Sequence, residues 1–223
     1  MLVLEKVTVR LGGIPILREV NIEIAKASTV ALIGANGAGK TTTLRTIMGL
    51  TKMTGRIGFD GGDLTVVAPS RRPILGIGYA AEDRRLFSGF TVEENIKMPG
   101  QVARFSSDEL QRRLARVYGI LPELREMAGR PAGAVSGGQG KMVALGRALM
   151  IGSKLIMLDE PFQGLAPALA RRYADALRKL RETDRNITLI ITESNPELLK
   201  NFAERTLVID RGVLRATRQA ALA

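Results

Sequence analysis

A glycine-rich stretch near the N-terminus holds the residues best suited to chemistry on a phosphorylated ligand. Residues 34–41 read Gly-Ala-Asn-Gly-Ala-Gly-Lys-Thr, which fits the pattern G-x-x-x-x-G-K-[ST]. Glycines allow the backbone to turn sharply, so that several N–H groups point at one phosphate. Lys40 would then reach the β- and γ-phosphates, and the Thr41 hydroxyl would bind Mg²⁺. The alternative is a glycine-rich turn with an ordinary surface lysine.

The segments on either side of this stretch favour the phosphate site. Residues 29–33 are β-branched and apolar and predict a buried strand, whereas residues 42–48 can form a helix that Gly49 ends. A helix that begins at the loop adds the positive end of its dipole to the site. We therefore interpret residues 34–41 as a phosphate-binding loop between a strand and a helix.

Two acids at the end of an apolar segment are a second candidate. Residues 155–158 predict a buried strand, and Asp159 and Glu160 follow directly. At the carboxyl edge of a parallel sheet, Asp159 would hold Mg²⁺ through water while Glu160 orients or activates an attacking water. Acids also end strands for structural reasons alone, so this interpretation depends on the phosphate loop upstream.

Residues 136–139, Ser-Gly-Gly-Gln, offer a second phosphate cradle ahead of a predicted helix at 142–149. Ser136 is a suitable N-cap, and the amides of Gly137 and Gly138 would add to the helix N-terminus. One nucleotide does not need two such cradles in one chain. A nucleotide bound to a second chain would explain the second one.

The composition limits the classes of function. The 223 residues suit one domain, or one domain with a subdomain, and contain no cysteine for a disulfide or a thiolate. The net charge of +11 favours nucleotides, nucleic acid or an anionic membrane surface. Aromatic residues make up only 4%, which disfavours a platform for stacking bases. Histidine is absent, so any mechanism that needs one must obtain it from another chain.

The hydropathy pattern predicts a protein of the cytoplasm. No apolar run approaches the roughly 18 residues that span a bilayer. The first residues lack the basic-then-apolar layout of a signal peptide.

The order of predicted elements indicates an α/β fold. Residues 84–134 look helical, with a capping box at Thr91–Glu94 and a helix that starts near Ser107. A basic helix is expected at 167–180, and the strands alternate with helices, which indicates a mainly parallel sheet. Strands are expected at 3–9, 20–24, 29–33, 56–60, 76–80, 155–158 and 187–191, with a final hairpin at 206–217.

The three motifs, taken in order, resemble those of ABC transporter ATP-binding subunits. Residues 34–41 resemble the Walker A motif, 135–139 the LSGGQ signature, and 155–160 the Walker B motif with its catalytic glutamate. The resemblance covers essentially the whole chain. It implies a RecA-like P-loop NTPase core (1–83 and 135–223) with a mainly parallel sheet, an N-terminal antiparallel β portion and an inserted α-helical subdomain (84–134).

The resemblance also implies partners and cofactors. Two cassettes would pack head to tail around two ATP molecules with Mg²⁺, each ATP lying between one loop and the other chain's signature. Residues 78–87, 91–95, 146–150 and 164–167 are most similar to the branched-chain amino acid importer type. That type implies an ATPase at the cytoplasmic face of the inner membrane, bound peripherally to membrane-spanning permease subunits beside a different second cassette. No nucleic acid partner is expected.

The resemblance assigns a role to each site residue, and several residues depart from the family pattern. Leu11 stands where an aromatic residue usually stacks on adenine, Ser194 where a switch histidine is usual, and Glu82 where most families have glutamine. Phe162-Gln163 and Gly140-Lys141 also replace common residues. The assigned residues are Glu160, Lys40 and Ser194 for catalysis; Gly34, Asn36, Gly37, Ala38, Gly39, Lys40, Thr41, Thr42 and Leu11 for nucleotide; Ser136, Gly137, Gly138 and Gln139 for the partner's ATP; and Thr41, Glu82 and Asp159 for metal.

Two alternatives stay open. One is an ABC ATPase that acts on DNA or ribosomes, although such proteins usually have long coiled coils, zinc modules or tandem cassettes that are not seen in this sequence. The other is a weakly catalytic, ATP-gated interaction module, favoured by the missing histidine and opposed by Glu160.

Overall fold

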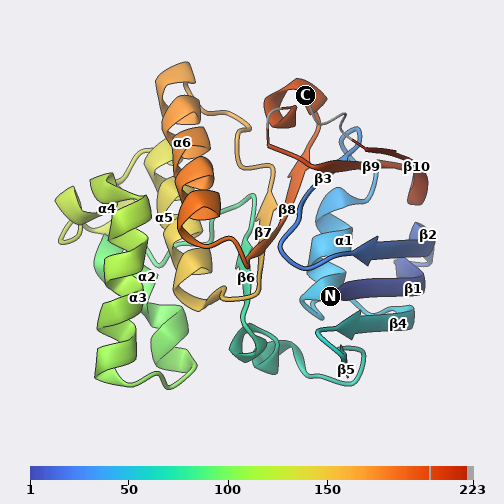
Figure 1. Cartoon of the computed structure of the whole chain (residues 1–223), viewed down its shortest axis with the longest axis horizontal. Coiled ribbons are helices and arrows are strands. Elements are labelled where there is room, and N and C mark those ends of the chain that lie inside the picture. Colours follow the sequence, from blue (N-terminus) through green and yellow to red (C-terminus); the bar gives the residue numbers. More distant parts are fainter. Residues whose placement is uncertain (201, 220–223) are drawn as a thin grey trace. The chain divides into compact units, whose positions relative to one another are not determined.

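The structure is a computed structural model that describes residues 1–200 and 202–219 (Figure 1). The chain forms two compact units, one from residues 1–72 with the described residues from 188 onward, the other from residues 73–187. In the described part of the chain, no helix is both long enough and apolar enough to cross a membrane.

The first unit contains an antiparallel sheet near the N-terminus. Its strands are β1 (Leu2–Leu11), β2 (Ile14–Ile24), β4 (Thr54–Phe59) and β5 (Gly62–Asp63), in the order β2-β1-β4-β5. Leu2 lies opposite Ile24 on β2 and Phe59 on β4, and all three are buried. The predicted N-terminal antiparallel portion is thus confirmed, with longer strands than the sequence indicated.

A second set of strands in the same unit supports the phosphate loop. Strand β3 (Thr29–Ile33) is buried along its whole length. It pairs in parallel with β8 (Thr188–Glu193) and with β9 (Arg205–Asp210), and β9 pairs with β10 (Val213–Gln219) as the predicted hairpin. Because β3 is covered by a strand on each edge, the loop that follows it starts from a fixed point. A short 3₁₀ helix (Pro196–Leu199) follows β8.

Helix α1 (Lys40–Ile47) begins where the glycine loop ends, and a buried arginine closes its other end. The Arg72 guanidinium, only 4% exposed, donates to the carbonyls of Thr46 (3.1 Å) and Ile47 (2.6 Å), the last residues of α1. It also donates to two carbonyls of the segment that leads to it, those of Leu64 (2.7 Å) and Val67 (3.0 Å). Burial lowers the pKa of Arg72, yet a guanidinium remains charged in proteins. Arg72 therefore ties the end of α1 to residues 64–67. A 3₁₀ helix (Pro69–Arg71) lies between them.

The second unit combines two parallel strands with a group of helices. Strand β6 (Ile77–Ala80) pairs with β7 (Leu155–Asp159), and Tyr79 lies opposite Met157. Helix α5 (Gly137–Ile151) packs on β6, and helices α2 (Val92–Val102), α3 (Ser107–Ile120) and α4 (Pro122–Glu126) pack on α5 (Figure 1). Helix α6 (Pro167–Thr183) follows β7. The remaining elements are two 3₁₀ helices, Pro73–Leu75 and Ala132–Ala134.

Helices α2 and α3 start at capping residues of the sequence. The capping box at Thr91 and Glu94 is present, as predicted. Helix α3 begins at Ser107, and Ser106 is its N-cap, with its hydroxyl accepting from the Glu109 amide at 3.2 Å. The predicted helical segment 84–134 contains α2, α3 and α4, and its assignment as a separate subdomain remains a prediction. The α/β class with a mainly parallel sheet is confirmed.

We predict that Arg72→Met destabilises the protein by about 3 kcal/mol, because it leaves three buried carbonyls and one partly buried carbonyl without their charged donor. Urea denaturation followed by circular dichroism measures the change. The matched control is Arg71→Met, which removes an exposed arginine from the preceding position and should change the free energy of unfolding by less than about 0.5 kcal/mol. Equal stability of the two variants would show that the Arg72 bonds contribute nothing.

Candidate nucleotide-binding site

The glycine loop is shaped by its packing on neighbouring strands. Gly39 has a φ of +116°, and a Cβ atom at this position would lie 2.8 Å from a methyl group of Leu17 on β2. A Cβ atom on Gly34 would lie 2.4 Å from the carbonyl oxygen of Ile209 on β9. Gly37 also has a positive φ, +79°, but open space surrounds its missing Cβ. Gly34 and Gly39 are therefore required by close packing, and Gly37 by backbone conformation.

The Lys40 side chain folds back into this loop. Its Nζ atom donates to the carbonyls of Gly34 (2.7 Å) and Ala35 (3.1 Å) and to the hydroxyl of Ser194 (3.1 Å). Ser194 in turn donates to Asn36 Oδ1 at 2.8 Å. Lys40 is only 4% exposed, so its charge is held inside the curve of the loop. The structure thus brings together four residues that the sequence assigned to one site, Gly34, Asn36, Lys40 and Ser194.

The loop fits a triphosphate by its own chemistry. No side chain caps the N-terminus of α1, since Gly39 is at the N-cap position. A helix N-terminus without a capping side chain, next to a lysine ammonium, attracts an anionic oxygen. Ala38 is buried in the loop, and Thr41 and Thr42, half-buried, occupy the first turn of α1. These features match what a nucleotide phosphate requires.

The predicted adenine contact, Leu11, lies at the end of β1 and is 49% exposed. It pairs with Ile14 across the turn to β2. Further along β2, the carbonyl oxygen of Ile16 is 3.4 Å from where a Cβ atom on Gly39 would be. The hairpin that bears Leu11 therefore packs on the phosphate loop. Contact of Leu11 with a base remains a prediction.

In the second unit, the two predicted acids lie at the end of β7. Asp159 is 2% exposed and accepts a hydrogen bond from the Tyr79 hydroxyl at 3.0 Å through Oδ2. Glu160 is 5% exposed and has a φ of +45°, which is rare for a residue other than glycine. Its backbone carbonyl accepts from Lys141 Nζ at 2.6 Å and from the Gln163 amide at 3.3 Å.

The predicted metal ligands come from both units. Thr41 belongs to the first unit, whereas buried Asp159 and exposed Glu82 belong to the second. The described residues contain no cluster of three or more acidic side chains that would hold an ion by themselves. Hydroxyl and carboxylate oxygens are ligands that Mg²⁺ accepts, together with water and substrate phosphates. The assignment of Thr41, Asp159 and Glu82 as metal ligands remains a prediction.

The signature residues form the first turn of α5. Ser136 is the N-cap, as predicted, and forms a capping box with Gln139 through bonds of 3.2 and 2.9 Å. The Gly137 carbonyl accepts from Arg84 at 3.0 Å. A Cβ atom on Gly138 would lie 2.1 Å from Leu169 Cδ2, so a larger residue there would require the Leu169 side chain to move. Contact of this turn with a partner's nucleotide remains a prediction.

Sequence reasoning missed three residues that hold the site residues in place. Tyr79 bonds Asp159, Lys141 bonds the Glu160 carbonyl, and Arg84 bonds the Gly137 carbonyl. Only Tyr79 had a usable signal, because strands were predicted at 76–80 and 155–158 within a mainly parallel sheet, and parallel strands end at one edge. The other two contacts join loops to helices and have no periodic pattern.

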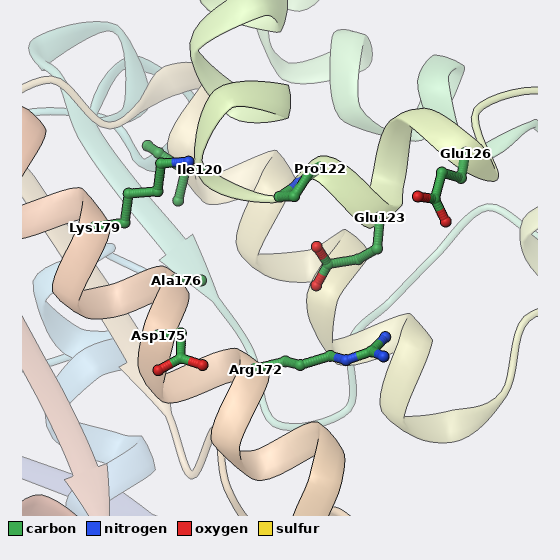
Figure 2. A pocket seen from close by; sticks show the side chains of 8 residues that line it. All are labelled: Ile120, Pro122, Glu123, Glu126, Arg172, Asp175, Ala176 and Lys179. Atoms are coloured by element: carbon green, nitrogen blue, oxygen red, sulfur yellow. The ribbon is translucent and has the colours of Figure 1, made fainter.

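A pocket of about 420 Å³ lies elsewhere in the second unit (Figure 2). Figure 2 shows Glu123 extending toward it from α4 and Arg172 from α6. None of the predicted site residues lines this pocket. It is therefore not the predicted nucleotide site.

We predict that Lys40→Ala weakens ATP binding about ten- to a hundredfold, because it removes a charge-assisted contact to the phosphates. Titration of a fluorescent ATP analogue measures the affinity. The control, Lys52→Ala, removes an exposed lysine of the same unit and should leave the affinity unchanged. Unchanged affinity in Lys40→Ala would rule out this loop as the phosphate site.

Comparisons with known proteins agree with this geometry. Residues 17–163 match the family described as ABC transporter. The high-affinity branched-chain amino acid transport ATP-binding protein BraG of Pseudomonas aeruginosa is 37% identical over 95% of this chain and 90% of its own length. A sulfate/thiosulfate import ATP-binding protein, CysA of Caulobacter vibrioides, is 34% identical over 90% of this chain and 59% of its own length. Among solved structures, the ADP conformation of MJ1267, an ATP-binding cassette of an ABC transporter, superposes with a TM-score of 0.84 at 28% identity, covering 98% of this chain and 91% of that one. The chain therefore belongs to the ABC transporter family, as one of its ATP-binding ATPase cassettes.

Proposed function

We propose that this cassette is the ATP-hydrolysing subunit of an importer for branched-chain amino acids or related solutes. The observation that supports nucleotide binding is the set of bonds that hold Lys40 inside a glycine loop at the start of α1. Hydrolysis is supported by membership of the ABC ATPase family. The solute class is supported by the 37% identity to BraG over nearly the whole chain. The likeness to a sulfate importer at 34% identity covers less of that relative, so the branched-chain type is the better supported solute class.

Each site residue has a role in this proposal. Lys40 and the first-turn amides of α1 bind the phosphates, Leu11 contacts the base, and Glu160 orients the attacking water. Thr41, Asp159 and Glu82 would hold Mg²⁺. The ion supplies positive charge that stabilises the phosphate oxygens during transfer.

The partners follow from the same proposal. The cassette binds peripherally to membrane-spanning permease subunits at the cytoplasmic face of the inner membrane. Within the cassette, residues 84–134 form a helical subdomain inserted into the core. The excess of basic residues, 33 Lys and Arg against 22 Asp and Glu, suits a site next to anionic lipid headgroups. A preference for nucleic acid at physiological salt would instead support an ABC ATPase outside transport.

The second cassette of the complex is a different chain in this proposal. Ser194 occupies the position of the switch histidine, and the chain has no histidine at all. A serine hydroxyl can donate one hydrogen bond but cannot become positively charged. Residues 136–139 would contact the nucleotide held by the partner's loop, so the two sites of the complex would differ in composition.

We predict that Glu160→Gln binds ATP as the wild type does but hydrolyses it at least about a hundredfold more slowly, because the amide keeps the shape and loses the carboxylate. In proteoliposomes with the copurified membrane subunits, ATP-dependent uptake of labelled leucine should fall, because one of the two unlike sites is lost. Size-exclusion chromatography with Mg-ATP should show a stable dimer of cassettes. The control is Glu126→Gln, an exposed acid on α4, which should transport normally. Hydrolysis by Glu160→Gln at the wild-type rate would remove Glu160 from this role.

We predict weak ATPase activity for this cassette alone and a large gain on adding its partner, because loss of one positioned donor costs on the order of 10²–10³ in rate. Ser194→His should raise the rate of the isolated chain, and Ser194→Ala, which adds no ring, is the matched control that should not. Steady-state phosphate release measures all three. The proposal of two unlike sites would be wrong if a homodimer of this chain hydrolysed about ten ATP per second, a typical enzyme rate, and if adding a second cassette did not change that rate.

A further inference from the structure

Lys141 connects the signature turn of α5 to the predicted catalytic glutamate within one chain. It lies two residues after Gln139, on the second turn of the same helix. Its Nζ atom donates to the backbone carbonyl of Glu160 at 2.6 Å, across 19 residues of sequence. Both residues belong to the second unit, so this bond lies within one compact body.

The bond acts on a backbone position that is unusual in itself. Glu160 has a φ of +45°, a conformation that side chains other than glycine rarely adopt. Its carbonyl has two donors, Lys141 Nζ and the Gln163 amide at 3.3 Å. A charged donor makes the stronger bond of the two and fixes the plane of the peptide that follows Glu160. Lys141 therefore holds the backbone directly after the Cα atom from which the Glu160 side chain extends.

A second contact joins the same two segments. A Cβ atom on Gly138 would lie 2.1 Å from Leu169 Cδ2 and 3.2 Å from Leu165 Cδ2. Leu165 and Leu169 belong to the segment that follows Glu160 into α6. The signature turn thus packs directly on the chain that leaves Glu160, and a displacement of one is transmitted to the other by close packing.

We propose that Lys141 is a positioning residue that makes the geometry of Glu160 depend on the state of the signature turn. The proposal rests on the proposed function, in which Ser136–Gln139 contact the nucleotide of the partner cassette. A nucleotide on that turn draws the start of α5 toward its phosphates. Lys141 passes the shift to the Glu160 carbonyl and sets the carboxylate for the nucleotide in the chain's own loop. The two ATP sites of a dimer are thereby coupled through each chain.

The test compares three variants of the full chain, assayed as the isolated cassette, so that every ATP site measured uses Glu160 and Lys141 of this chain. Lys141→Met removes the donor and keeps the length of the side chain, whereas Lys141→Arg keeps a charged donor. Lys179→Met, an exposed lysine on α6, is the matched control. The readouts are kcat, KM and the Hill coefficient for ATP, with the ATP dissociation constant and Tm measured in parallel. A residue that only stabilises the fold would move Tm and ATP affinity together with the rate.

Lys141→Met should lower kcat about tenfold, the effect expected from one charged hydrogen bond, and bring the Hill coefficient close to one. KM and the ATP dissociation constant should stay within twofold, Lys141→Arg should recover most of the rate, and the control should match the wild type. The proposal is overturned, and the proposed function stands, if Lys141→Met keeps the wild-type kcat and Hill coefficient, or if loss of ATP affinity and Tm accounts for its lower rate. A wild-type chain that binds no ATP would overturn both.

Discussion

A buried ammonium group must be surrounded by acceptors, and the first unit is arranged around that requirement for Lys40. Burying an ammonium group without acceptors costs on the order of several kcal/mol, or the group loses its proton. The carbonyls of Gly34 and Ala35 and the hydroxyl of Ser194 supply the acceptors. They meet only because β3 and β8 pair in parallel, with Ile33 opposite Glu193, so that the loop and Ser194 leave the sheet at the same edge. The glycines of the loop then allow the close approach.

The same use of backbone carbonyls recurs throughout the chain. Arg72 closes the end of α1 and Lys141 holds the Glu160 carbonyl. Arg113 and Arg116 of α3 donate to the last carbonyls of α5, at Met150 (3.0 Å) and Leu149 (3.3 Å). A net charge of +11 first indicates an anionic partner. The structure shows that part of this excess has an internal role, because these cations donate to carbonyls at helix ends and in loops.

Much of the fold was predictable, and the reason lies in local patterns. Buried strands such as 29–33 and 155–159 are continuous apolar runs, and the caps at Thr91 and Ser136 are local signals that the structure confirms. The contacts that shape the site are of another kind. Lys40 and Ser194 are 154 residues apart and meet through strand pairing, and Lys141 reaches a carbonyl that has no sequence signature. Such contacts depend on register and on loop paths, which no single segment specifies.

We infer that Lys40 is held on its own loop until a triphosphate replaces those carbonyls. A crystal structure of the wild-type chain with a non-hydrolysable ATP analogue and Mg²⁺ tests it directly. We expect Lys40 Nζ within hydrogen-bonding distance of the β- and γ-phosphate oxygens and farther than 3.5 Å, the usual limit for such a bond, from the Gly34 carbonyl. A bound analogue whose phosphates lie away from residues 34–41, with Lys40 still bonded to Gly34 and Ala35, would contradict the account.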